Sequence, residues 1–202
     1  MNTKPRLDKH ELILAKGAQV MIRRGYHGTG VQEIVKAAGV PKGSFYHYFA
    51  SKEDFAVQAL AHLYEPRLQR YATALNDPMH SPRQRIMAYY RELLAYFAAQ
   101  EQCQHHCFIG SLSFEMAELC KPLGEEVEQI LQRSAQILSE CLTAAREAGE
   151  LSADTDCPAL AEFISNAWQG ALMRMKVSAS VAPLTLFINQ LERLLTPSTT
   201  VS

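Results

Sequence analysis

The feature that most constrains the fold is a pair of short helical patterns joined by a tight turn, at residues 29–49. Thr29 followed by Gln32 fits a capping box, and the helix that it predicts, VQEIVKAAG, stops at Gly39 after about two turns. Pro41 then favours a second short helix, PKGSFYHYF, because proline suits the first helical position. Two short helices around so tight a turn predict a helix-turn-helix arrangement.

The rest of the chain is also periodic in the manner of helices. A first helix is expected over residues 8–24, ended by Gly25, with these apolar positions on one side: Leu12, Ala15, Val20 and Ile22. Ser51 with Asp54 opens a long helix that Pro66 should kink or divide. Later helices are expected at 81–100, 107–119, 122–148, 157–178 and 183–195. Gly and Pro are sparse and β-branched runs are absent, so we predict an all-α fold of about nine helices.

Charge separates the chain into two parts. Residues 1–52 carry nine basic and three acidic side chains, a net +6, whereas residues 53–202 carry 11 basic and 18 acidic ones, a net −7. We call residues 1–52 the head and residues 53–202 the body, and the head is the candidate DNA-binding domain. A basic head favours a polyanionic partner. The other reading is a solvated, lysine-rich face.

Several classes of protein are excluded or made improbable by what the sequence lacks. No run of 18 apolar residues predicts a membrane span, and the charged N-terminus is not that of a secretory signal, so a cytoplasmic protein is expected. In that setting the five cysteines are expected to be thiols. The usual catalytic motifs, including the nucleotide-binding glycine loops and H-E-x-x-H, are absent. We therefore expect no enzyme activity, no cofactor and no metal.

The second short helix offers polar groups that suit DNA. Lysine, serine and tyrosine fit phosphate oxygens and base edges, a glycine lets a backbone approach closely, and helix N-termini favour a phosphate. On these grounds the expected DNA contacts are Thr29, Lys42, Gly43, Ser44, Tyr46, His47, Tyr48 and Lys52. The alternative is that the aromatic rings only cover a small core.

Residues 25–55, GYHGTGVQEIVKAAGVPKGSFYHYFASKEDF, resemble the DNA-binding head of the TetR family of transcriptional regulators. The order is the family's: threonine before the second helix, A-A-G-V, K-G-S-F-Y-H-Y-F, then S-K-E. The resemblance implies an all-helical homodimer that binds a palindromic double-stranded DNA operator and carries an effector pocket in its body. Gln32, where many members have a basic residue, is counted among the DNA contacts, although this departure puts one phosphate or base contact in doubt.

The family's last two helices usually form a four-helix dimer interface. In this chain two apolar stripes are expected to do so, made of Ile164, Trp168, Ala171, Leu172, Met175, Leu184, Phe187, Ile188 and Leu191. The alternative is that both stripes face the core of the single chain.

The segment Cys103-Gln-His-His-Cys107 has three readings. Its cysteines and histidines could bind zinc, although four ligands from five consecutive residues surround one ion poorly. Cys107 could be an ordinary buried residue. It could also be a sensor, because a thiol at a helix start beside imidazoles has a lowered pKa. Residues 107–118 resemble the matching stretch of TetR-family repressors that respond to N-ethylmaleimide, which have a reactive cysteine there.

The expected function is therefore a repressor released from its operator by a small-molecule effector, either an electrophile or oxidant at Cys107 or a reversible ligand. A pocket for such a ligand is expected between the body's long helices, with these candidates in its lining: Tyr64, Tyr89, Phe97, Phe114, Met116 and Trp168. The rival classes are a small helical thiol-dependent transferase and a helical dimer whose head binds protein.

Overall fold

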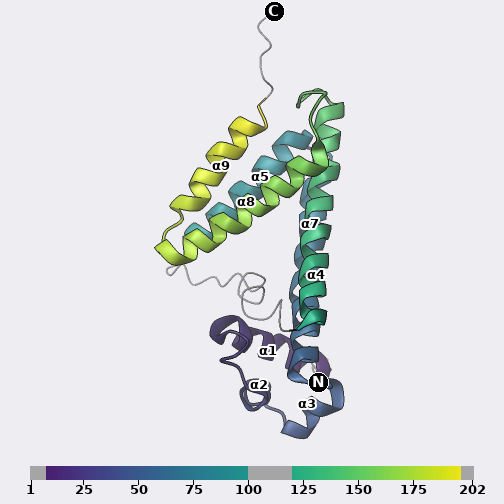
Figure 1. The fold of residues 1–202 in the computed structure, drawn as a ribbon, viewed down its shortest axis with the longest axis vertical. Helices are drawn as coiled ribbons and strands as arrows, with labels where there is room; N and C mark the ends of the chain where they lie inside the picture. The colour runs from purple at the N-terminus through teal and green to yellow at the C-terminus, as the bar shows by residue number, and fades with distance from the viewer. Residues whose placement is uncertain (1–7, 100–119, 197–202) are drawn as a thin grey trace, which may run out of the picture. The chain divides into compact units, whose positions relative to one another are not determined.

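The computed structural model describes residues 8–99 and 120–196. Within them it contains eight helices and no strand, which confirms the all-α expectation (Figure 1). The helices are α1 (Lys9–Arg24), α2 (Val31–Ala38), α3 (Lys42–Tyr48), α4 (Lys52–Leu75), α5 (Pro82–Ala98), α7 (Lys121–Glu147), α8 (Cys157–Ser178) and α9 (Ala182–Leu194). The helix expected at 107–119 lies outside the described residues.

Side-chain caps explain where several helices begin. Asp8 accepts the His10 N–H at the start of α1, and Asp156 accepts the Ala159 N–H at the start of α8. Ser81 accepts the Gln84 N–H at the start of α5. These contacts satisfy backbone donors that a helix leaves unpaired at its first turn.

The starts of α2 and α4 test the two expected capping boxes. The box of Thr29 with Gln32 is wrong, because the cap residue of α2 is Gly30 and it is the Glu33 carboxylate that accepts the Gly30 N–H, at 2.9 Å. At α4 the expected cap is confirmed, since the Asp54 N–H donates to the Ser51 hydroxyl at 3.1 Å. The Asp54 carboxylate in turn accepts the Ala50 N–H at 2.8 Å.

The described residues form two compact units. The first contains residues 8–66 and 120–129, and the second contains 67–99 and 130–196, so α4 and α7 contribute to both. Pro66, the last residue of its stretch in the first unit, lies inside α4. Of the two expectations for Pro66, a divided helix is wrong, because α4 is a single element, and a kink stays a prediction.

The core of the first unit is aromatic. Phe45, Phe49 and Phe55 are almost fully buried, and their ring centroids lie 5.1–5.6 Å apart. Gly17 brings α1 close to them, since a Cβ at this position would lie 2.6 Å from both Ile34 and Phe55. The close approach turns a different side of α1 inward from the one expected, so the buried residues are Ile13, Leu14, Gly17, Ala18, Val20 and Met21.

The core of the second unit is larger and draws on five helices: α4, α5, α7, α8 and α9. Tyr90 of α5 lies at its centre, with its ring 5.1 Å from those of Trp168 and Phe187. Burial raises the pKa of Tyr90, whose hydroxyl lies 3.4 Å from that of Tyr71.

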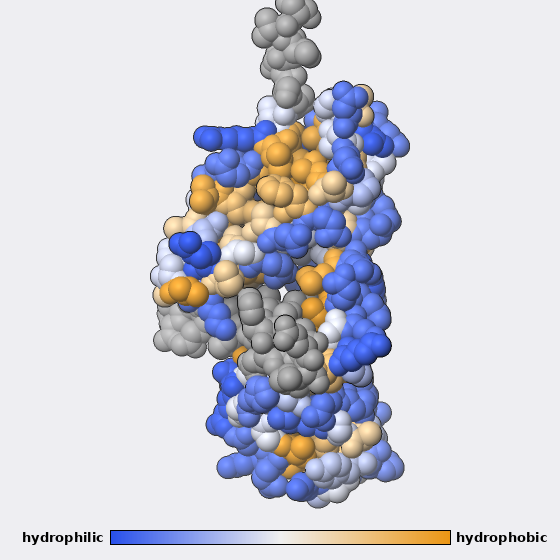
Figure 2. Space-filling view, viewed as in Figure 1, coloured by the Kyte–Doolittle hydropathy of each residue, from blue (hydrophilic) through white to orange (hydrophobic). Residues whose placement is uncertain are grey.

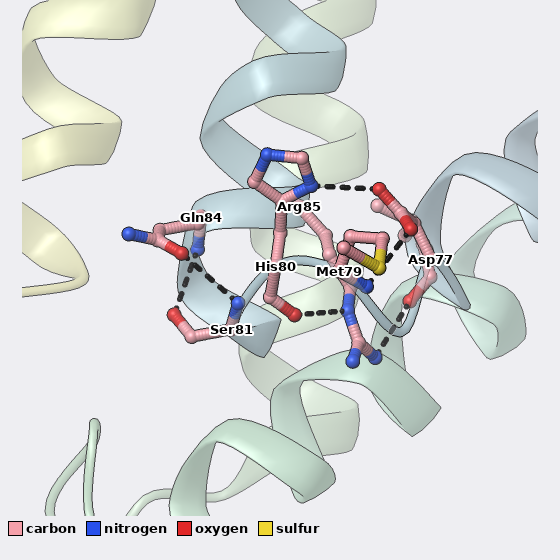
Figure 3. A network of polar contacts seen from close by, with 7 residues as sticks. Asp77, Met79, His80, Ser81, Gln84 and Arg85 are labelled. Carbon is pink, nitrogen blue, oxygen red and sulfur yellow. Dashed lines mark hydrogen bonds and ion pairs between the residues drawn. The ribbon is translucent and has the colours of Figure 1, made fainter.

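A polar network fixes the turn between α4 and α5 (Figure 3). The Asp77 carboxylate accepts the Met79 N–H and contacts His80 Nδ1 at 2.7 Å, and these contacts, the backbone one first, lower the pKa of Asp77. Arg85 Nε donates to the His80 carbonyl at 2.8 Å. The turn is therefore held by its own side chains.

Candidate DNA-binding surface and effector body

The turn between α2 and α3 has the geometry that its sequence predicts. Gly39 adopts the left-handed conformation, φ 66° and ψ 33°, which favours glycine. The Val40 N–H donates to the Val35 carbonyl at 3.0 Å, so the last turn of α2 is closed by backbone alone. Pro41, in extended conformation, is the cap residue of α3. The helix therefore begins at Lys42, one residue later than the start expected at Pro41.

Packing divides the side chains of α3 into a buried and an exposed set. Phe45 has no exposed surface and anchors the helix in the aromatic core. Ser44 and Tyr48 are half-buried, and the exposed set consists of Lys42, Gly43, Tyr46 and His47. Tyr46 is 54% exposed, with the Lys42 ammonium 5.9 Å from its ring centroid. One side of α3 is thus free to meet a partner.

Gly43 has no structural need to be a glycine. It lies inside α3, its φ is not in the left-handed region, and a Cβ added to it would meet nothing within 4 Å. A glycine in a helix interior costs about 0.5–1 kcal/mol relative to alanine. The missing side chain is therefore explained better by a close approach from outside than by packing within.

For Tyr48 the alternative holds in part, namely that the aromatic rings of the second short helix cover a small core. Its ring lies 5.6 Å from that of His10 in α1 and 4.7 Å from that of His47. Tyr48 therefore covers the head's core on one side, whereas Tyr46 and His47 face solvent. Gln32, in the first turn of α2, is also exposed.

Thr29 and Lys52 stand apart from the other expected contacts. Thr29 has no exposed surface, and its hydroxyl donates to the Gly25 carbonyl at 2.8 Å. The Lys52 ammonium donates to the carbonyls of Tyr26 and Thr29, at 3.1 Å each. In this conformation both side chains hydrogen-bond within the loop before α2 or to it, and their contacts with DNA stay predictions.

Within the second unit, α8 and α9 form an apolar groove of about 1070 Å³. Figure 2 shows apolar surface gathered over these helices. Phe163 and Leu186 line it and are 61% and 60% exposed, which is high for large apolar side chains. A contiguous apolar surface of this kind marks an interaction site more often than a solvated face.

The comparisons with known proteins agree with this geometry. Residues 13–59 match the family described as "Bacterial regulatory proteins, tetR family", and residues 82–191 match "Tetracyclin repressor-like, C-terminal domain". The chain belongs to the TetR family.

Two relatives of similar length are named repressors. The chain is 33% identical over 187 residues to the HTH-type transcriptional repressor DhaR of Mycobacterium sp. (strain GP1), covering 93% of this chain and 92% of DhaR. It is 36% identical over 189 residues to the HTH-type transcriptional repressor NemR of Escherichia coli (strain K12), covering 91% and 92%. The crystal structure of the reduced form of E. coli NemR superposes with a TM-score of 0.85 at 33% identity, covering 93% of this chain and 97% of that one.

This TetR-family chain is therefore a DNA-binding transcriptional regulator and not an enzyme, and repression is the direction of control that its relatives support. Regulators of this family bind DNA and ligands and are dimers.

The interface expected on α8 and α9 consists mostly of side chains that are buried within the single chain. Leu172 is half-buried and packs against the core, and the rest of the expected set is at most 9% exposed: Ile164, Trp168, Ala171, Met175, Leu184, Phe187, Ile188 and Leu191. They pack into a core shared with α4, α5 and α7, which agrees with the alternative reading, and their place in an interface stays a prediction. Four of them, Ile164, Ala171, Phe187 and Leu191, also form part of the groove lining.

The expected pocket residues are distributed over the molecule. Tyr64 is half-buried in the first unit. In the second unit, Trp168 lies 6.4 Å from Phe97, and Tyr89 packs on Tyr71 at 4.4 Å, with the pKa of Tyr89 raised to about 12 by burial. Phe114 and Met116 lie outside the described residues, so the pocket stays a prediction.

Cys107 also lies outside the described residues, as does Cys103. Cys120, Cys141 and Cys157 are free thiols and buried. Burial raises the pKa of Cys141 to about 11, and its thiol donates to the Pro82 carbonyl at 3.4 Å. A thiol held protonated in this way is a poor nucleophile, so Cys141 is unsuited to sensing.

Residues 8–99 and 120–196 contain neither a cluster of metal-ligand side chains nor a membrane-spanning helix. No group of three or more His, Cys, Asp and Glu side chains there could hold a metal ion. No helix in these ranges is long and apolar enough to span a membrane.

Sequence reasoning missed four functional candidates. Tyr26 and Glu53 secure the loop before α2 (below), and Phe163 and Leu186 line the groove. The sequence did contain a signal for Phe163 and Leu186. Both lie between the residues of the core stripes, on a side of the helix that does not face the core, where a large apolar side chain is unexpected.

Proposed function

We propose that this regulator is a homodimeric repressor that acts in the cytoplasm and occupies a palindromic operator. The observation that carries the proposal is the exposed side of α3, where Lys42, Tyr46 and His47 face solvent while Phe45 fixes the helix from behind. A helix of this kind enters a major groove about 12 Å wide. In this arrangement Lys42 meets a phosphate or guanine, and Gly43 admits the DNA backbone. The head's net +6 supplies the non-specific attraction.

The second copy is proposed to dock on the α8/α9 groove. Phe163, Leu186 and Leu194 are exposed apolar side chains there, and burying them against identical surfaces stabilises a twofold dimer. Two heads are needed because a single short reading helix contacts too few base pairs for specificity, whereas twofold pairing places two helices in successive major grooves.

Release is proposed to come from an effector that acts on the body. Cys107 is the favoured sensor, because Cys120, Cys141 and Cys157 are buried and burial raises the pKa of Cys141. The relation to NemR, whose crystal structure is that of a reduced form, also favours thiol chemistry. The Cys107 thiol would lose its proton to solvent, and the thiolate would add to the C=C bond of a maleimide or quinone to form an S–C bond. The enolate left by the broken π bond would then take a proton from solvent. A reversible ligand between the body's helices is the second candidate.

The test is fluorescence anisotropy on DNA from upstream of the chain's own gene, at two salt concentrations, with and without a maleimide. Tight, salt-sensitive binding that the maleimide abolishes in the wild type and not in Cys107→Ser supports both parts of the proposal. Equal release of both proteins contradicts the sensor, and absence of salt-sensitive binding contradicts the operator function.

Cys141→Ala is the matched control. It removes a buried thiol that burial keeps protonated, so it should respond to maleimide like the wild type. A Cys141→Ala protein that resists the maleimide would move the sensor away from Cys107.

A further inference from the structure

The ammonium group of Lys52 lies in a cage of carbonyl and ring atoms. Its Nζ donates to the Tyr26 carbonyl and to the Thr29 carbonyl at 3.1 Å each, and lies 3.9 Å from the centroid of the Tyr26 ring. Two of its three donors are thus satisfied by backbone, and the ring face adds a cation–π contact. A lysine that reaches a phosphate would have to leave these contacts.

Glu53, the residue after Lys52 in α4, holds the same loop through the side-chain hydroxyl of Tyr26. The Tyr26 hydroxyl donates to Glu53 Oε1 at 2.6 Å, and Tyr26 is only 3% exposed. This hydrogen bond is the largest cause of the lowered pKa of Glu53, about 2. Charge-assisted bonds of this length are strong. Two residues in the first turn of α4 therefore bind Tyr26: Lys52 contacts its carbonyl and its ring, and Glu53 accepts a hydrogen bond from its hydroxyl.

The loop that these contacts hold, residues 25–30, leads directly into α2. It is tightly wound, since a Cβ on Gly28 would lie 2.3 Å from the Arg24 carbonyl oxygen, and the Thr29 hydroxyl donates to the Gly25 carbonyl. The Thr29 carbonyl that Lys52 holds immediately precedes Gly30, the cap residue of α2. A loop fixed at this point fixes where α2 begins relative to α4, both within the first unit.

We propose that Lys52 is a positioning residue, which ties the loop before α2 to the first turn of α4 and so holds the α2–turn–α3 element in its DNA-reading arrangement, and that it is not a phosphate contact. The inference rests on the proposed DNA-binding function. When the tie is lost, the fraction of heads in the competent arrangement falls, and the apparent affinity falls by the same factor.

Salt dependence separates positioning from phosphate contact. Each phosphate neutralised contributes about 0.9 to the slope of log K against log salt concentration. Lys52→Met keeps the aliphatic stem and removes the ammonium. We expect operator affinity to fall about tenfold at every salt concentration, with a slope within about 0.3 of the wild-type value. Lys42→Met, at an exposed position of α3, is the matched control and should lower the slope by about 2, because a dimer loses two such contacts.

A conservative variant and a second measurement guard against a misfolded protein. Lys52→Gln keeps an amide donor without charge, and it should recover part of the lost affinity at the wild-type slope. Amide hydrogen exchange of the DNA-free protein should quicken at residues 26–30 in Lys52→Met and stay unchanged in Lys42→Met.

The outcomes are distinct. A slope lowered by about 2 in both Lys52 variants, which is two contacts per dimer, makes Lys52 a phosphate contact and overturns the inference. Unchanged affinity and unchanged exchange in Lys52→Met overturn it as well. If the wild type itself shows no salt-sensitive DNA binding, the proposed function fails, and the exchange measurement still decides whether Lys52 holds the loop.

Discussion

The head and the second compact unit differ in what they leave exposed. On α3 the side chains that face solvent are polar, and the aromatic residues behind them are buried. On α8 and α9 the reverse holds, since the exposed groove includes Phe163 and Leu186, and the buried stripe behind it belongs to the core. The contrast teaches that burial within one chain is a poor guide to function here. Function is read from the exposed side of each element: a polar one for DNA, an apolar one for a second copy.

The largest expected effect is on the stability of the first compact unit, which contains the head. Phe55→Ala removes a fully buried ring that contacts Phe45 and Phe49, so we expect the free energy of unfolding to fall by about 3–5 kcal/mol. Operator binding should be lost, while sedimentation still shows a dimer because the groove lies in the other unit. Urea unfolding measures the first effect, and Phe55→Leu, which keeps most of the apolar volume, is the control. A loss below about 1 kcal/mol would contradict the aromatic core as the head's main support.

The next largest effect concerns the apolar groove of α8 and α9 and tests whether a second copy binds there. Leu186→Glu places a charge in the apolar groove, and we expect a monomer whose operator affinity is lower by about 100-fold, since interface centres contribute 2 kcal/mol or more. Thr185→Glu puts the same charge on the adjacent exposed residue, which does not line the groove, and should remain dimeric. Sedimentation equilibrium distinguishes them. A dimeric Leu186→Glu protein would place the interface elsewhere.

A third variant, in α3, should change operator binding without lowering the stability of the fold. Gly43→Ala meets open space within the protein, so its free energy of unfolding should be equal to the wild type or higher by about 0.5–1 kcal/mol. Operator binding should nevertheless weaken about tenfold, because the added methyl group occupies space that the DNA backbone needs. Unfolding and anisotropy are measured on the same protein. Unchanged binding would remove Gly43 from the interface.

The smallest effect is pH-dependent. The Tyr26 hydrogen bond, with a second bond from Ser51, lowers the pKa of Glu53 from 4.5 to about 2. A carboxylate with a lowered pKa stabilises the folded state above its unfolded pKa, and this stabilisation is lost as the pH falls from 4.5 towards 2. Because Glu53 is exposed, the contribution is at most about 1 kcal/mol. The melting temperature of Glu53→Gln should therefore change less than that of the wild type across this range, and identical pH profiles would refute the assignment.

Local signals made the head predictable to the level of single turns. Gly39 and Pro41 act through their own backbone preferences, so the turn and both of its helices follow from the sequence. Where a contact with a distant residue decides, the sequence misleads. The inward side of α1 depends on Gly17 meeting Phe55, 38 positions later in the chain, and the cage around Lys52 depends on carbonyls of residues 26 and 29.

In the body the periodicity of α8 and α9 was sufficient to predict helices with apolar stripes, but not which side of each helix would pack into the core. Core and interface both select apolar residues, so the two stripes are alike in sequence. Only the packed structure separates Trp168, which lies within the core, from Phe163, which lies outside it.

Hydroxyl-radical footprinting of the upstream DNA, at about 0.15 M salt, tests the central claim most directly. Two copies with one α3 each predict two protected segments on the same face of the duplex, about one helical turn apart or slightly more. Gly43→Ala should weaken both segments equally. A single protected segment, or uniform protection that a scrambled duplex reproduces, would contradict the account of a dimer that reads DNA through α3.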